Sequence, residues 1–257
     1  MFCSTANNGL QNKVLIDKLS KTRHDESIKF LETNNEDEMV EILADAFVND
    51  PLFVWLAQKP DSLSDLEKKR AQLDYNRWLC RGLNSLVLSR KRGVVLGVKE
   101  GNQMAGSMCL VPSSCNPPGI LDWIIYYFFK GGIPPYEQKE AKNNYGPMCQ
   151  SRIDSMGVLV KKRKEAMKPY SEYIYLYQVA VHSDFQGKGF GGKLFNTLFA
   201  AADSLGVPVY LETESEENEA LYHRLGFQTI ETPLLSVKGD TSVDAEFKMY
   251  TMLRQPR

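Results

Sequence analysis

One short segment constrains the fold of this chain more than any other, because it predicts a strand, a glycine loop and a helix in direct succession. The run "YIYLYQVAV" at residues 173–181 is apolar and rich in β-branched and aromatic residues, which is typical of a buried central strand. The loop "FQGKGFGGKLF" follows at residues 185–195, and apolar residues then recur at helical spacing as far as Gly206. Glycines that open a helix allow an anion to approach the free N–H groups of its first turn. The segment therefore predicts a phosphate-binding site.

Three phosphate-binding patterns match this loop. Gly187, Gly189 and Gly192 match the dinucleotide fingerprint G-x-G-x-x-G, and residues 187–193 match the start of the triphosphate loop G-x-x-x-x-G-K. The third match is Q-x-x-G-x-G, formed by Gln186, Gly189 and Gly191. The triphosphate loop requires Ser or Thr after its Lys to hold magnesium. Leu194 occupies that position here, which disfavours a triphosphate site.

The dinucleotide pattern has one supporting residue and two conflicts. Glu212 ends the next predicted strand about 20 residues on, where a ribose-binding acid belongs. However, "HSDFQ" separates the strand from Gly187, whereas the fingerprint expects its first glycine at the strand end. Fewer than 70 residues follow the motif, which is too short for the rest of a doubly wound domain. A dinucleotide-binding oxidoreductase is therefore the weaker alternative.

The composition restricts the class of partner and the compartment. The 257 residues include 31 Lys and Arg and 32 Asp and Glu, so bulk charge gives no reason to expect nucleic acid. No run approaches the roughly 20 apolar residues of a membrane span, and no secretory leader is recognisable. The five cysteines form no C-x-x-C pair, which argues against a disulfide framework or a zinc site. We expect a cytoplasmic protein without membrane attachment.

Periodicity predicts one mixed α/β domain at residues 26–257, preceded by a weakly ordered tail at residues 1–25. Two apolar segments joined by "EGNQ" predict a β-hairpin near residues 93–112, and helical patterns cover most of 36–90 and 119–170. After the glycine loop we expect a helix to Leu205 and further strands. The predicted strands are 207–213, 227–232 and a last one at "AEFKMYTML", 245–253.

Residues 173–227 also resemble a known family. The strand "QVAV", the loop Q-x-x-G-x-G, the segment "LET" followed by Asn218, and "LYHRLGF" occur in the order typical of the GNAT superfamily of acetyl-CoA-dependent N-acetyltransferases. The spacing of Glu212, Asn218 and Tyr222 is most similar to the puromycin-acetyltransferase-type branch. The resemblance implies a single GNAT-type domain, with a twisted mixed sheet flanked by helices and splayed at the coenzyme-binding strand.

The resemblance also implies how acetyl-CoA is bound, without any metal. Backbone groups at Val179, Ala180 and Val181 would pair with the pantetheine arm, and one N–H there would face the developing oxyanion. The diphosphate would lie on the loop, and Asn218 would bond the coenzyme arm, unless it serves only as a helix cap. A bare structural turn is the alternative for the glycines. The loop residues implied are Gln186, Gly187, Lys188, Gly189, Phe190, Gly191 and Gly192.

Two residues match catalytic positions of the family. Tyr222 would be the general acid that protonates the departing thiolate, and an ordinary packed aromatic is the alternative. Glu212 would be the general base for the amine, with an ordered water relay or a plain ion-paired carboxylate as alternatives. The histone-modifying branch uses a Glu in the preceding strand, where this chain has Tyr175. Glu172 and His182 are weaker candidates because both fall at predicted strand ends.

The predicted reaction is direct acetyl transfer to a primary amine of a small-molecule or peptide acceptor. A non-catalytic coenzyme-A binder of the same fold is the competing class. Aromatic residues between 122 and 136 would either line the acceptor pocket or pack in the core. The charge run "KKRK" at 161–164 is expected to form a solvated helix face rather than a nuclear or polyanion signal. The acceptor and the oligomeric state are not predicted.

Overall fold

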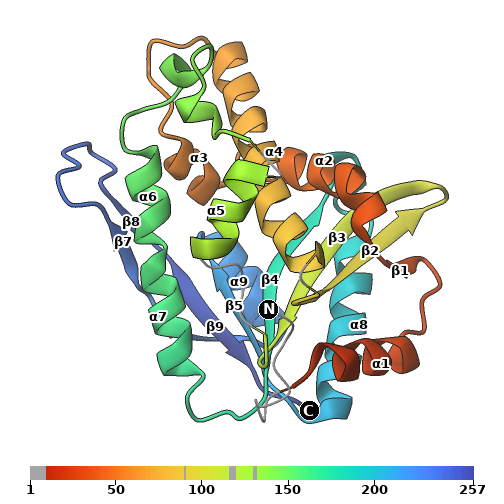
Figure 1. Ribbon diagram of the computed structural model, residues 1–257. Coiled ribbons are helices and arrows are strands. Elements are labelled where there is room, and N and C mark those ends of the chain that lie inside the picture. The colour runs from red at the N-terminus through yellow and green to blue at the C-terminus, as the bar shows by residue number, and fades with distance from the viewer. Residues whose placement is uncertain (1–9, 90, 116–119, 130–131) are drawn as a thin grey trace.

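A seven-stranded sheet carries helices on both faces in the computed structural model, which describes residues 10–89, 91–115, 120–129 and 132–257 (Figure 1). The strands of this sheet are β1 Ile28–Phe30, β2 Val94–Glu100, β3 Gln103–Pro112, β4 Ile174–Val181, β5 Val209–Thr213, β6 Gln228–Glu231 and β9 Tyr250–Arg254. A separate hairpin consists of β7 Leu234–Ser236 and β8 Glu246–Lys248.

The helices account for most of the remaining described chain. They are α1 Asn12–Thr22, α2 Glu36–Ala46, α3 Pro51–Ala57, α4 Asp65–Ser89, α5 Ile120–Phe129, α6 Cys149–Ser155, α7 Gly157–Ala166, α8 Phe190–Leu205 and α9 Glu216–Arg224. The predicted hairpin at residues 93–112 is confirmed, since β2 and β3 pair around a turn at Gly101. Gly206 ends α8 in a left-handed conformation, as predicted.

The sheet has the order β1-β2-β3-β4-β5-β9-β6, and its centre is opened by one incomplete pairing. All neighbours are antiparallel except β4 and β5, which run parallel. That parallel ladder joins only Ile174 to Val209 and Tyr175 to Tyr210. Beyond Tyr175 the two strands separate, and the mixed α/β fold with a sheet splayed at β4 is confirmed.

Each face of the sheet has its own core. Helices α1 and α8 cover one face, where Leu194, Leu198 and Ala201 of α8 are fully buried (Figure 1). Helices α2, α3, α4, α6 and α7 cover the other face over a second core, which includes Met39, Tyr75 and Tyr210. The apolar run of β4 contributes to both cores because alternate side chains point to opposite faces. This explains why the run lacks polar alternation.

The expected weakly ordered tail is wrong for the described residues before 26. Residues 12–22 form helix α1, whose Leu15 and Leu19 are fully buried beside α8. These two leucines lie four residues apart and so share one face of the helix. The surrounding Asn, Lys and Ser residues are on the solvent side, which is why the composition suggested a tail. Residues 1–9 lie outside the described part of the chain.

The last predicted strand is in fact two. Met249 separates β8 from β9, and β8 pairs with β7 in the outlying hairpin instead of joining the main sheet. Arg152 of α6 is fully buried beneath the hairpin loop, where it binds Asp240 at 2.8 Å and Asp244 at 3.1 Å. Its guanidinium also stacks 4.7 Å from the Trp55 ring of α3. The Arg152 side chain therefore links the hairpin loop and α3 to α6.

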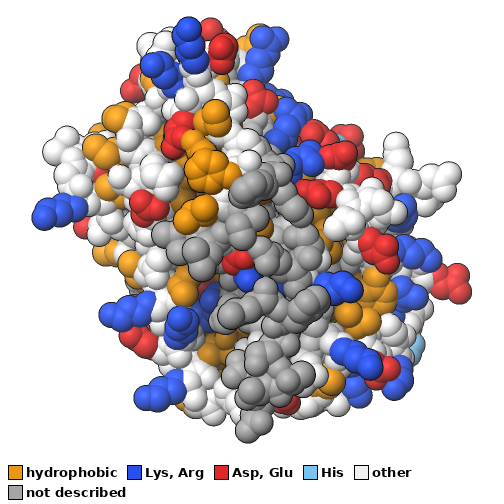
Figure 2. All heavy atoms as spheres, viewed as in Figure 1, with side chains coloured by type: hydrophobic (Ala, Val, Ile, Leu, Met, Phe, Trp, Pro, Cys, Tyr) orange, Lys and Arg blue, Asp and Glu red, His pale blue; other side chains and the backbone are white. Residues whose placement is uncertain are grey.

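The surface charges are mixed, and the described cysteines are buried. On the face drawn in Figure 2, Lys and Arg side chains stand among Asp and Glu side chains. Cys80, Cys109 and Cys149 are buried free thiols, Cys115 is also buried, and Cys3 lies outside the described residues. Within the described ranges, none of the helices has the length and apolarity needed to cross a bilayer.

Candidate active site

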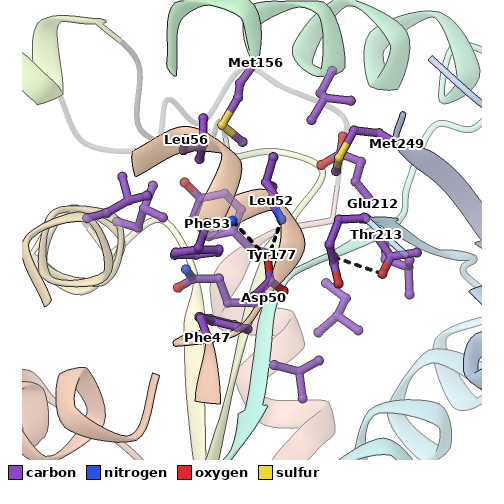
Figure 3. A pocket seen from close by; sticks show the side chains of 18 of the residues that line it. Phe47, Asp50, Leu52, Phe53, Leu56, Met156, Tyr177, Glu212, Thr213 and Met249 are labelled. Carbon is purple, nitrogen blue, oxygen red and sulfur yellow. Dashed lines mark hydrogen bonds between the residues drawn. The ribbon is translucent and has the colours of Figure 1, made fainter. Parts of the chain in front are cut away.

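A cavity of about 320 Å³ opens where β4 and β5 separate. Its walls come from α3, α6, α7 and α9 as well as from both strands, so segments far apart in the sequence meet there. Figure 3 shows Phe47, Phe53 and Leu56 on the α3 side, facing Glu212 and Thr213 of β5. Most of the lining is apolar, and four charged side chains interrupt it: Asp50, Arg163, Glu212 and Glu214.

The open edge of β4 carries two of the three predicted backbone sites. Val181 lies opposite Gly106 of β3, and the next residue, His182, donates its N–H to Ala105. Backbone bonds of an antiparallel ladder alternate along the strand. Ala180 therefore directs its backbone groups toward β3, while those of Val179 and Val181 face the gap. The Val181 carbonyl accepts the Gln186 side-chain amide at 3.1 Å, so Gln186 ties the loop to the strand end.

The glycine loop lies at the N-terminus of α8, directly after β4 and the short 3-10 turn Ser183–Phe185. Gly187 and Gly189 have φ values of 74° and 86°, which side chains with a Cβ rarely adopt. Gly192 lies inside the helix, and a Cβ placed there would meet no atom within 4 Å. Packing does not explain a glycine at this position, whose helix propensity is poor. An open approach to the helix N-terminus does explain it.

Replacing Gly192 by Ala separates these two explanations. We expect the free energy of unfolding to rise by about 0.5–1 kcal/mol, because Ala is the better helix former. A ligand that contacts the helix N-terminus would meet the added methyl, so we expect the Kd for coenzyme A to rise at least tenfold. Chemical denaturation and calorimetry measure the two quantities. Asn196→Ala, one turn further along α8 on an exposed position, is the control and should leave the Kd unchanged. An unchanged Kd in Gly192→Ala would assign the glycine to a bare turn.

Tyr222 and Asn218 both line the cavity from α9. Ser215, and not Asn218, caps this helix, since its hydroxyl accepts the Asn218 N–H at 3.1 Å. The Asn218 side-chain amide donates to Glu214 at 2.5 Å. The Tyr222 ring packs edge-on against Phe195 and Phe227, which orients its hydroxyl. Burial, followed by the nearby carboxyl groups of Glu214 and Asp50, raises the pKa of Tyr222, so the phenol stays protonated.

Glu212 lies in the cavity wall under a group of tyrosines. It accepts hydrogen bonds from the hydroxyls of Tyr175 and Tyr210, the latter at 3.1 Å. The exposed part of its side chain faces the cavity, and the surrounding protein raises its pKa by desolvation, against the lowering effect of Arg163 and both tyrosines. Tyr175, where the histone-modifying branch has Glu, is thus a hydrogen-bond donor to Glu212.

A second acidic group, which the sequence analysis missed, faces Tyr222. Asp50 caps α3 by accepting the N–H groups of Leu52 at 2.9 Å and Phe53 at 3.1 Å (Figure 3). Burial and the adjoining Glu214 carboxyl, with which Asp50 shares a hydrogen bond, raise the pKa of Asp50 to about 8. With its pKa of about 8, the Asp50 carboxyl is mostly protonated at neutral pH. Asp50 precedes Pro51 at the start of α3, and no local pattern connects it with Glu214.

The other predicted features have mixed outcomes. Lys161 and Lys164 are exposed, as expected for "KKRK", but Arg163 is only 5% exposed and lines the cavity. Of the aromatic stretch, Trp123 lines the cavity and Tyr126 is buried in the core, whereas Phe128 is exposed. Lys188 lies at the surface with its ammonium 5.1 Å from the Phe185 ring.

A splayed sheet with a glycine loop at one side of the gap and a protonated phenol inside it defines an acyl-transfer domain. The sequence model of the Acetyltransferase (GNAT) domain family matches residues 155–229. These residues include β4, the loop, β5 and α9. The chain contains a GNAT acetyltransferase domain, and its class is N-acetyltransferase.

Individual proteins are similar to this chain in sequence or in fold. An uncharacterized N-acetyltransferase of Schizosaccharomyces pombe is 26% identical over 201 residues, which cover 77% of this chain and 73% of that protein. The polyamine N-acetyltransferase of Drosophila melanogaster, which forms N-acetylagmatine, has a TM-score of 0.53 at 15% identity over 89% of this chain and 98% of its own. A Corynebacterium glutamicum structure described as histone acetyltransferase HPA2 and related acetyltransferase has a TM-score of 0.51 at 19% identity, over 90% and 96%. Both structures share the fold.

Proposed function

We propose that the protein transfers an acetyl group from acetyl-CoA directly to a primary amine in the cavity between β4 and β5. The observation that carries the proposal is the juxtaposition of an open β4 edge with a protonated Tyr222 and a carboxyl pair in one cavity. GNAT acetyltransferases use acetyl-CoA as cosubstrate. The loop from Gln186 to Gly192 would hold its diphosphate, and Val179 and Val181 its pantetheine arm.

The proposed step balances without a metal or a covalent enzyme intermediate. A carboxylate removes a proton from the ammonium form of the acceptor, and the free amine attacks the thioester carbonyl. The C–N bond forms and the C–S bond breaks, while Tyr222 donates its proton to the departing thiolate. The second proton of the attacking nitrogen is then lost and restores the proton on Tyr222, so that the amide is neutral. An N–H of the Val179–Val181 edge would stabilise the oxyanion. The products are the acetylated amine and coenzyme A.

Two carboxyl groups are candidates for the base. Glu212 is the family-like choice, but both tyrosine hydroxyls donate to its oxygens. Asp50 has a pKa of about 8, raised by burial and by the adjoining Glu214, and this value is close to the range in which a base works at neutral pH. We favour Asp50, with Glu212 as the alternative that the variants described in the Discussion distinguish.

Amine-dependent thiol release tests the proposed activity. The full chain is incubated with acetyl-CoA and a panel of primary amines, and free thiol and acetylated product are both measured. We expect thiol release only where an acetylated amine appears. Binding of coenzyme A without turnover across the panel would favour the non-catalytic binder. Heat on mixing with NADH but none with coenzyme A would instead favour the oxidoreductase.

The finer predictions belong to this proposal. The compartment would be the cytoplasm, and the branch would be the puromycin-acetyltransferase type. The Drosophila neighbour acts on a small amine, which supports a small-molecule acceptor. An acceptor in a cavity bordered by Asp50, Glu212 and Glu214 would arrive as a cation and lose its proton there.

A further inference from the structure

Arg163 is the charged residue of the cavity that the proposed reaction does not use. It lies on α7, and its neighbours in the run 161–164 include the exposed Lys161 and Lys164. Only 5% of Arg163 is exposed, and its guanidinium stacks 4.3 Å from the Tyr175 ring. The helix exposes these two lysines to water and buries its one arginine. Charged side chains are rarely buried without a partner, so the burial of this cation suggests a binding role.

Within the described residues, the Arg163 guanidinium makes no hydrogen bond and no ion pair, whereas its backbone carbonyl accepts the Met167 N–H at 2.9 Å. Glu212 is the nearest acid that influences it, yet the oxygens of Glu212 accept the hydroxyls of Tyr175 and Tyr210. A guanidinium has five N–H donors and cannot lose its charge in a protein. Buried cations are ordinarily paired, because desolvation is costly. Arg163 lines the cavity, where a bound ligand can contact it, and it also lines a smaller hollow beside Tyr173.

The cavity thus holds two sites of opposite character. The pair Asp50 and Glu214 suits an ammonium group, and Arg163 suits a planar carboxylate, which it can bind through two parallel bonds. The remainder of the lining is largely apolar and aromatic, with Phe53 and Trp123 among its members. A volume of about 320 Å³ lies at the small end of ligand cavities, which span about 300–1,000 Å³.

We propose that the acceptor is a free amino acid, whose carboxylate binds Arg163 while its amine reaches the acetyl group. This inference rests on the proposed function and specifies its substrate class. Arg163 acts as a specificity-determining residue and takes no part in bond making. A plain amine lacks the anionic partner and leaves the guanidinium buried without a hydrogen bond.

Matched pairs of acceptors test the inference. Each pair has an amino acid and the amine made by its decarboxylation: arginine and agmatine, ornithine and putrescine, phenylalanine and phenethylamine, leucine and isoamylamine. For the wild-type chain we expect at least one amino acid to exceed its paired amine in kcat/KM about 30-fold or more, since unpairing a buried charge costs about 2 kcal/mol or more. In Arg163→Met we expect that ratio to fall to about one. The kcat/KM of the paired amine should fall much less than that of the amino acid.

Arg163→Lys is the matched variant, because it keeps the charge and loses the two parallel bonds. It should retain part of the preference, mainly as a raised KM. Thermal unfolding of both variants shows whether they fold. If Arg163→Met does not fold, Arg163→Lys alone tests the inference. A preference for the amino acid over its amine equal to that of the wild type would then overturn the assignment of Arg163 to the carboxylate.

Other results contradict the inference in distinguishable ways. Equal kcat/KM for both members of every pair in the wild-type chain would overturn it while leaving the N-acetyltransferase function intact. An equal loss for both members in Arg163→Met would show that Arg163 only supports Glu212. If no acceptor releases thiol, the proposed function fails, and calorimetry of arginine against agmatine on the coenzyme-A complex decides the carboxylate site alone. Tighter binding of arginine that disappears in Arg163→Met would support it, and equal binding would refute it.

Discussion

Tyr222→Phe should lower kcat about 100-fold or more while the Kd for acetyl-CoA changes less than twofold. The variant removes a single oxygen and leaves the ring contacts with Phe195 and Phe227 in place. Burial and the carboxyl groups of Glu214 and Asp50 raise the pKa of Tyr222, so the hydroxyl holds its proton until a thiolate takes it. General acid catalysis contributes about 10²–10⁴ in rate. Steady-state kinetics with a saturating amine and calorimetry with coenzyme A measure the two effects.

The control for this prediction is Tyr250→Phe. Tyr250 is a buried tyrosine of β9 whose hydroxyl lies 3.4 Å from Glu216 and which does not line the cavity. Its kcat should stay near that of the wild type. A kcat within twofold of wild type in Tyr222→Phe would remove the tyrosine from the acid role and make it a packed aromatic.

Asp50→Asn should lower kcat/KM about 100-fold at neutral pH and abolish an inflection near pH 8. The carboxyl of Asp50 has a pKa of about 8 because of burial and the adjoining Glu214, so the wild-type rate should rise with pH up to that value. Glu214→Gln removes a like charge and should move the inflection to lower pH. Asp74→Asn, an exposed acid of α4, should change neither property. The pH dependence of kcat/KM for the four chains is the measurement.

Glu212→Gln separates the two candidate bases. If Asp50 is the base, Glu212→Gln lowers activity but retains the inflection near pH 8. Loss of the inflection in Glu212→Gln, with its retention in Asp50→Asn, would make Glu212 the base and contradict our preference.

The same titration has a consequence for stability. The folded pKa of Asp50 is raised above the unfolded value of 3.8, so its contribution to stability is present below about pH 4 and is lost as pH rises through about 8. Asp50→Asn does not titrate. Its stability relative to wild type should therefore increase between pH 4 and pH 8, which thermal unfolding across that range would show.

Much of the fold was predictable because its signals are local. The apolar run at 173–181, the glycines after it and the helix ending at Gly206 are each recognised from neighbouring residues, and the structure confirms their order. The errors arose where burial depends on distant segments. Leu15 and Leu19 form a core only because α8 lies beside them, and β8 leaves the main sheet only because β7 pairs with it.

For the site, the sequence by itself determined the chemistry that lies within one strand-loop-helix unit and the strand and helix after it. The glycine loop, Tyr222, Asn218 and Glu212 belong to that continuous stretch, so their spacing in the chain carries information about their spacing in space. Only the tertiary structure brought Asp50 against Glu214 and Arg163 against Tyr175. Asp50 lies at the start of a helix far from Glu214 in the sequence, and Arg163 lies on a separate helix that packs over β4. The pKa of Asp50 and the burial of Arg163 are set by partners that no local pattern encodes.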